Sequence, residues 1–147
     1  MKKNNIFDQL KGFLDYQGTL YTQINDKTLQ INLDTEVASV TMLVMHQENH
    51  IALLVPVLSK IDGSPHNLNV FYEYLLKENF SSELKYSLTP DKTLTLNTFM
   101  DIDVEPENNT ERFVKKLTEL KVFFRFQYPK LIDAVSDLDL KVAETPT

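Results

Sequence analysis

The feature that most constrains the fold is a repeated change in the spacing of apolar residues along the chain. Three segments carry apolar residues at steps of three and four, which is typical of amphipathic helices. Between them lie segments in which apolar and polar residues alternate or apolar residues run together, which is typical of strands. Most links between strands are too short for the crossover that parallel strands require. The sequence therefore predicts a mostly antiparallel sheet combined with three helices.

The predicted helices carry suitable residues at several of their ends. Residues 6–16 form the first helix, and Gly18 follows where a left-handed cap is common. Ser64 is placed to cap the second helix, with Pro65 at its first helical position. Asn79 stands where a left-handed residue would end that helix. These signals separate helical from extended parts of the chain.

The third predicted helix is rich in aromatic residues. One of the polar residues 108–110 can cap its start, and a break is expected at Pro129. Three phenylalanines near its middle cannot all face one core, so we expect some of them to face a partner. We take Phe123 and Phe126 as the candidate homodimer interface.

The remaining segments predict an α+β fold in the order helix, three or four strands, helix, two strands, helix. The predicted strands occupy residues 20–24, 29–33, 37–45, 50–58, 84–88 and 94–104. At 147 residues with 42% hydrophobic content, the chain can enclose one core without disulfides or metals. We expect a single domain over residues 1–140 and a flexible tail over residues 141–147.

Charge and cysteine usage exclude several classes of partner. The formal net charge is −6 and the pI is about 5.0, which disfavours nucleic acid and anionic membranes. The chain has no cysteine, which removes thiol chemistry and fits a reducing cytoplasm. Its three glycines are not spaced as a phosphate-binding loop. We therefore expect a cytoplasmic protein without a cofactor.

Few residues are candidates for catalysis. His46 and His50 flank a short loop and could approach each other, while Asp101 and Asp103 could share one face of a strand. A small metal-dependent hydrolase would have to use these four residues, but a metal site needs a full ligand set and no second cluster accompanies them. Solvated strand ends and an acidic run before a helix explain them more simply. We predict no enzyme activity and no metal.

Several short motifs resemble a known fold family. Residues 71–80, which include Leu75-Leu76-x-x-Asn79, are similar to a segment of the type III secretion chaperone (Tir chaperone-like) family and the related YbjN family. Residues 94–102 resemble a late strand of that family, and Tyr128-Pro129-Lys130-Leu131 resembles the end of the last helix in the YbjN branch. The resemblance implies a small acidic protein, often homodimeric, that binds an extended segment of a client or acts as a regulator.

The leading hypothesis is a non-enzymatic, chaperone-like or regulatory adaptor that binds an extended segment of another protein. A toxin-neutralising or signalling partner on the same fold is an alternative. An exposed sheet edge can accept such a segment by strand addition. We predict that the first hairpin provides this edge because its polar face lacks a second apolar layer. The candidate partner-binding residues are Leu20, Thr22, Ile24, Leu29, Gln30, Ile31, Asn32 and Leu33.

Overall fold

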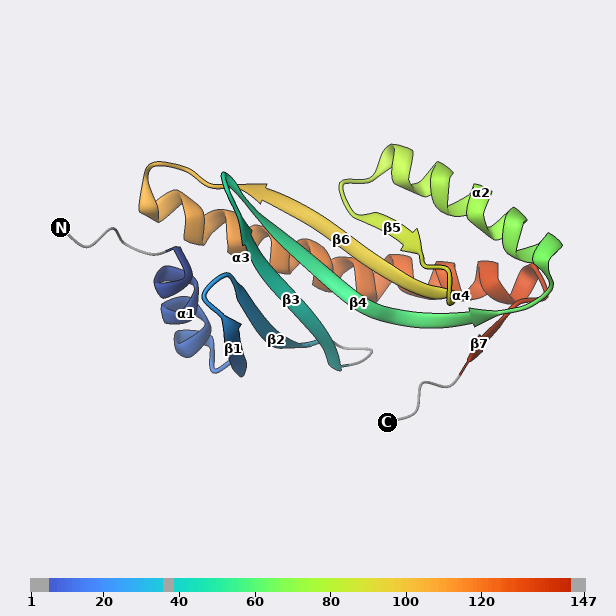
Figure 1. Ribbon diagram of the computed structural model, residues 1–147, viewed down its shortest axis with the longest axis horizontal. Coiled ribbons are helices and arrows are strands. Elements are labelled where there is room, and N and C mark those ends of the chain that lie inside the picture. The colour runs from blue at the N-terminus through green and yellow to red at the C-terminus, as the bar shows by residue number, and fades with distance from the viewer. Residues whose placement is uncertain (1–5, 36–38, 144–147) are drawn as a thin grey trace.

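The protein is built on one antiparallel sheet, and a long helical run crosses one face of it (Figure 1). The computed structural model describes residues 6–35 and 39–143. The predicted α+β class and the order of its helices and main strands are confirmed. The elements are α1 (Ile6–Gln17), β1 (Tyr21–Asn25), β2 (Thr28–Asp34), β3 (Ser39–Gln47), β4 (His50–Asp62), α2 (Pro65–Ser81), β5 (Lys85–Leu88), β6 (Thr93–Asp101), α3 (Pro106–Val122), the π-turn η1 (Phe123–Gln127), α4 (Tyr128–Asp137) and β7 (Lys141–Ala143).

The sheet has the strand order β1-β2-β3-β4-β6-β5, and its neighbouring strands are antiparallel. β7 joins it by pairing with the end of β4. Because Lys60 pairs with Thr93 of β6 and also with Ala143 of β7, β7 lies on the side of β4 that faces β3. β1 and β5 are therefore the two outer strands of the main path.

The core lies between one face of the sheet and the helices. Alternate residues of the inner strands point into it, as with Leu29 and Ile31 of β2, which are fully buried. The ring of Phe13 on α1 meets the ring of Phe113 on α3 edge to face, with 6.2 Å between centroids. This contact places α1 and α3 on the same side of the sheet.

Two helix ends form as the sequence predicts. Gly18 has a φ of 71°, a conformation that is unfavourable for residues with a Cβ, and Thr19 N donates to Leu14 O at 2.9 Å. At the start of α2, Ser64 Oγ accepts a hydrogen bond from Asn67 N at 3.2 Å. Local sequence is sufficient to set both ends.

Two other predicted helix ends are wrong. Asn79 does not end α2, which continues to Ser81, because its side chain is bonded to the backbone of β5 instead. α3 begins at Pro106, before the polar residues 108–110 that were expected to cap it. Pro106 suits the first turn of a helix, where its missing N–H leaves no bond unmade.

The break expected at Pro129 takes the form of the π-turn η1, which interrupts the α-helix just before the proline, and the helical run then continues as α4. Tyr128 N–H donates to Phe123 O, five residues earlier, instead of to the carbonyl four residues earlier. Pro129 has no N–H, and its ring would crowd the carbonyl of Arg125 in a regular α-helix. The wider turn just before the proline gives that ring room.

Two predicted segments, residues 37–45 and 141–147, extend beyond the residues that the structure describes. Residues 141–143 were expected to belong to a flexible tail, but they form β7 against β4, and residues 144–147 lie outside the described residues. The predicted strand 37–45 is observed from Ser39, and Val37 and Ala38 also lie outside the described residues. In the part of the chain that is described, no helix combines the length and apolar content needed to span a bilayer.

Candidate partner-binding edge

The first hairpin forms as predicted, and β1 is its outer strand. Tyr21 pairs with Ile31, and Asn32 N donates to Leu20 O at 3.3 Å. Hydrogen-bonded and non-bonded pairs alternate in an antiparallel ladder, so the backbone groups of Tyr21 and Gln23 point away from β2. We call these outward N–H and C=O groups the β1 edge.

The structure divides the predicted binding residues into accessible and inaccessible ones. Leu20 and Ile24 are 77% and 53% exposed. Thr22 and Asn32 are also exposed, and Gln30 is half-buried. The apolar residues of β2 belong to the core instead, and they are Leu29, Ile31 and Leu33.

The strand β2 is not an edge, which corrects part of the predicted site. It is paired with β1 on one side and with β3 on the other, and Asn32 N already donates to β1. A proline at Gln30 or Asn32 would therefore disrupt the sheet and would not report on partner binding alone. The accessible backbone of this region belongs to β1.

Side-chain contacts hold β1 in place on its helix-facing side. The amide oxygen of Gln23 accepts a hydrogen bond from Lys11 Nζ of α1. Gln23 Nε2 donates to Asn25 O at 3.1 Å, and Lys27 N donates to Asn25 Oδ1 at 2.9 Å in the turn. These bonds use side chains and turn groups, so they do not involve the outward backbone N–H groups of Tyr21 and Gln23.

A polar hollow of about 490 Å³ adjoins the start of β1. Leu20 and Asn32 line it from the hairpin, and Asp34, Ser39 and Lys121 line it from β2, β3 and α3. The hollow therefore places one acidic and one basic side chain beside the exposed Leu20. A strand added to β1 could extend a side chain toward this hollow.

The opposite edge of the sheet is covered by side chains of α2. Asn79 Nδ2 donates to Tyr86 O at 2.9 Å, and Asn79 Oδ1 accepts from Tyr86 N at 2.6 Å. Tyr72 OH donates to Leu88 O at 2.6 Å. Burial raises the pKa of the Tyr86 hydroxyl well above its ordinary value, with the hydroxyl of Tyr74 and the carboxylate of Glu78 adding to the shift.

A second hollow, of about 420 Å³, lies where β3 and β4 separate. Their pairing stops at Leu43 and Leu54, although both strands continue. Pro56 lacks an N–H to donate, and β4 bulges between Val55 and Ser59. The residues that line the hollow are uncharged: Ser39, Val40, Thr41, Pro56, Val57, Leu58, Phe124 and Tyr128.

The structure separates the two residues of the predicted dimer interface. Phe123 is 3% exposed and packs in the core, so it is not accessible to a second chain. Phe126 is 55% exposed, and the Arg125 guanidinium lies 5.2 Å from its ring centroid. The π-turn accounts for the difference, because residues three apart share one side of a regular α-helix, whereas the wider turn carries Phe126 away from the side of Phe123. A role for Phe126 in dimerisation stays a prediction.

The two histidines that flank the β3–β4 turn do not come together. Gln47 pairs with His50, and His46 is adjacent to Gln47, so the two imidazoles face opposite sides of the sheet. The ring centroids of His46 and Phe7 are 6.0 Å apart. The ring centroids of His50 and Phe99 are 5.4 Å apart, and His50 Nε2 lies 2.9 Å from Gln47 Oε1. Among residues 6–35 and 39–143, no group of three potential metal ligands is present.

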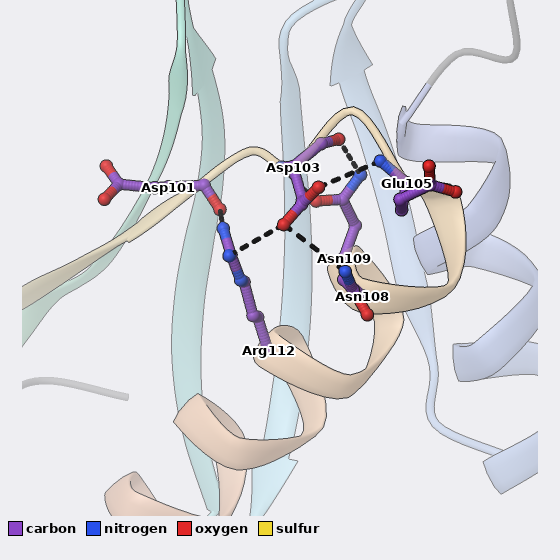
Figure 2. A network of polar contacts seen from close by, with 6 residues as sticks. All are labelled: Asp101, Asp103, Glu105, Asn108, Asn109 and Arg112. Carbon is purple, nitrogen blue, oxygen red and sulfur yellow. Dashed lines mark hydrogen bonds and ion pairs between the residues drawn. The ribbon is translucent and has the colours of Figure 1, made fainter.

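Asp101 and Asp103 likewise do not form the predicted pair, because β6 ends at Asp101. Figure 2 shows the Asp101 carboxylate pointing away from the network around Asp103. Asp103 accepts hydrogen bonds from Glu105 N at 2.9 Å, Asn108 Nδ2 at 3.3 Å and Arg112 at 2.9 Å. The bond from Glu105 N contributes most to lowering the pKa of the Asp103 carboxyl. This carboxylate organises the start of α3.

Comparison with known proteins identifies the fold. No family model and no curated protein matches the sequence. A solved structure of YbjN from E. coli, a proposed transcription regulator, matches with a TM-score of 0.55 and 18% identity, covering 93% of this chain and 96% of that chain. The chain has the YbjN fold. The likeness predicted from the short motifs is thus confirmed for the fold.

The sequence did not reveal which side chains of this YbjN fold form hydrogen bonds with backbone groups that would otherwise lack a backbone partner. Asn79 binds Tyr86, and Asn109, which is 4% exposed, accepts from Asp103 N at 2.6 Å and donates to Asp103 O at 3.0 Å. Both asparagines had been interpreted as helix caps. No local pattern separates a cap from such a clamp, because the clamped residue lies six or seven positions away.

Proposed function

We propose that this protein is a non-enzymatic adaptor that holds an extended segment of a partner protein by strand addition to the β1 edge. The observation that carries the proposal is the accessible strand β1, which has outward backbone groups and the exposed side chains Leu20 and Ile24. Leu20 also lines the polar hollow beside the start of β1. Backbone hydrogen bonds would supply affinity, and contacts to alternate side chains would supply selectivity.

The charge of the chain supports a protein partner. With a net charge of −6, any regulatory role of the kind proposed for YbjN is better served by binding another protein than by binding DNA. The lack of cysteine supports action in the cytoplasm. The histidines and aspartates that a hydrolase would need face different surroundings, which leaves the proposal without a catalytic component.

The test uses peptides selected from a displayed library of short unstructured sequences, measured by fluorescence anisotropy. Gln23→Pro removes an outward N–H that the ladder with β2 does not use, so folding should survive. Gln23→Ala is the matched control, because it removes the same side chain and keeps the N–H. We expect Gln23→Pro to weaken binding about tenfold, the equivalent of roughly 1.4 kcal/mol, and Gln23→Ala to retain most of the affinity.

Two results would contradict this proposal. Peptides that bind wild type and Gln23→Pro equally well do not use the β1 edge, and the hollow beside Pro56 would then become the next surface to test. A library that yields no binder to the folded wild-type protein would remove the support for an extended ligand. Circular dichroism of both variants establishes that any loss is not caused by unfolding.

A further inference from the structure

One side of β4 carries a break in the sheet, between the part that pairs with β3 and the part that pairs with β7. The ladder with β3 reaches Leu54, and the ladder with β7 begins at Lys60. Residues 55–59 lie between the two ladders, and within the described part of the chain no strand pairs with them on this side. We call these residues the β4 gap. An unpaired stretch of strand presents N–H and C=O groups that another extended segment can bind.

The uncharged hollow of about 420 Å³ lies beside the β4 gap. Residues 56–58 of β4 line it on one side, and residues 39–41 of β3 line it on the other. These residues of β3 pair with β2 on their far side but have no described partner on the side toward β4. Two strand edges therefore flank one hollow, and no strand is described between them.

The chain itself leads toward the β4 gap after β7. β7 is antiparallel to β4, and its last described pair sets Ala143 opposite Lys60. A continued register places Glu144 opposite Ser59, which is the first residue of the gap that this direction reaches. Figure 1 shows β3 and β4 running apart from their shared turn, with β7 at the far end of β4. The residues that follow β7 are therefore the nearest extended segment available to fill the gap.

The position of Pro146 suits this register. Ile61 N donates to Lys92 O at 2.9 Å, so the backbone groups of Ile61 face the β6 side, and those of its two neighbours face β7. The odd-numbered residues of β7 are the partners of these neighbours, so they are turned toward β4. The same alternation turns Thr145 toward Leu58 and turns Pro146 away from β4. A proline has no N–H to donate, so it is tolerated where no bond to β4 is made.

We propose that residues 144–147 of this chain occupy the β4 gap as a continuation of β7, inserted between β3 and β4. The added residues run antiparallel to β4. Glu144 and Ser59 form a non-hydrogen-bonded pair, and Thr145 and Leu58 form a hydrogen-bonded pair. This segment closes the break in the sheet from within the chain. The pairing does not involve the β1 edge, at the far end of the strand order.

Engineered disulfides test the register, because the natural chain has no cysteine. A non-hydrogen-bonded antiparallel pair has its Cα atoms about 4.5 Å apart, a distance that a disulfide can span. We expect Ser59→Cys with Glu144→Cys to form a disulfide within one chain in oxidised glutathione. Ser59→Cys with Thr145→Cys is the matched control. Its two side chains point to opposite faces of the sheet, so it should oxidise roughly tenfold more slowly. Mass spectrometry of unreduced peptides measures both rates.

Amide hydrogen exchange tests the backbone bonds in a chain without cysteines. Removing residues 144–147 should accelerate exchange of the Leu58 amide about tenfold or more, while the amide of Leu53, further along β4, keeps its rate. Thr145→Pro removes the N–H that is turned toward β4, so it should accelerate Leu58 exchange in the same direction. Thr145→Ala is the matched control, because it keeps that N–H and should leave the exchange of Leu58 close to wild type.

Three outcomes would overturn the proposal. If both cysteine pairs oxidise at the same rate, residues 144–147 do not hold one register against β4. If the disulfide joins two chains, the segment in the β4 gap belongs to a second copy. If exchange at Leu58 is the same with and without residues 144–147, these residues make no bond to the gap.

Discussion

The two outer strands of the sheet, β1 and β5, differ in what lies along their outer edges. Along β5, the side chain of Asn79 bonds both outward backbone groups of Tyr86, and Tyr72 bonds the carbonyl of Leu88. Along β1, the side-chain bonds involve Gln23 and the turn, and the outward backbone groups of Tyr21 and Gln23 face away from the sheet.

The difference shows how one sheet can restrict strand addition to one side. An uncovered edge invites pairing with any extended chain, and proteins block edges that they do not use. Here α2 supplies the block on β5 through side chains whose amide and hydroxyl groups replace a neighbouring strand. If β1 is a binding edge, removing the block on β5 should make the two edges more alike.

The largest effect should come from removing the asparagine that covers β5. Asn79→Ala leaves the N–H and C=O of Tyr86 unpaired at a site that is 8% exposed, so the free energy of unfolding should fall by about 1–3 kcal/mol. Urea unfolding measures this. Hydrogen exchange of the Tyr86 amide should accelerate toward that of the Gln23 amide.

The matched control for Asn79 is Asn69→Ala, which changes an exposed asparagine on the same helix. Its unfolding free energy should stay within about 0.5 kcal/mol of wild type. If the two variants have the same stability, the bonds from Asn79 do not contribute to the edge, and the contrast between β1 and β5 is lost.

A smaller effect is expected from Tyr72→Phe, which removes only the hydroxyl that donates to Leu88 O. The ring stays, so its packing is preserved, and stability should fall by about 0.5–1.5 kcal/mol. Urea unfolding again measures it, and the Asn79→Ala variant is the reference. A loss larger than that of Asn79→Ala would mean that the hydroxyl, and not the amide, is the main cover of β5.

The smallest effect concerns the ion pair that ties the segment before β5 to α3. Lys116 Nζ lies 3.0 Å from Glu83 Oε2, and this hydrogen bond is the main cause of the lowered pKa of the Glu83 carboxyl, whose ordinary value is 4.5. A lowered folded-state pKa contributes stability at pH above the ordinary value, and this contribution fades as the pH falls through the folded-state pKa.

Glu83→Gln should therefore be slightly less stable than wild type at neutral pH and should converge with it in acid. Thermal unfolding across the acidic range measures the difference. The effect is small because the Glu83 side chain is 76% exposed, where solvent screens the pair. A difference that grows as the pH falls would show that the pair does not act through the charge of Glu83.

The limits of prediction from sequence follow the range of the interactions involved. Gly18 and Ser64 were predicted correctly because a helix end depends on neighbours within a few residues. Asn79 and Asn109 were misinterpreted because their partners belong to other elements. The histidines and the aspartates were separated by strand parity and by the end of β6, neither of which composition reveals.

By itself, the sequence determined the α+β class, the antiparallel hairpins and the order of the main elements, because apolar periodicity and turn residues act over short distances. Tertiary structure alone decided that β1 is an open edge while α2 covers β5, and that Phe123 is buried while Phe126 is exposed. These outcomes depend on which distant segments pack together and on one π-turn next to Pro129. Accessibility is a property of the whole fold, so the surfaces available to a partner could be assigned only from the structure.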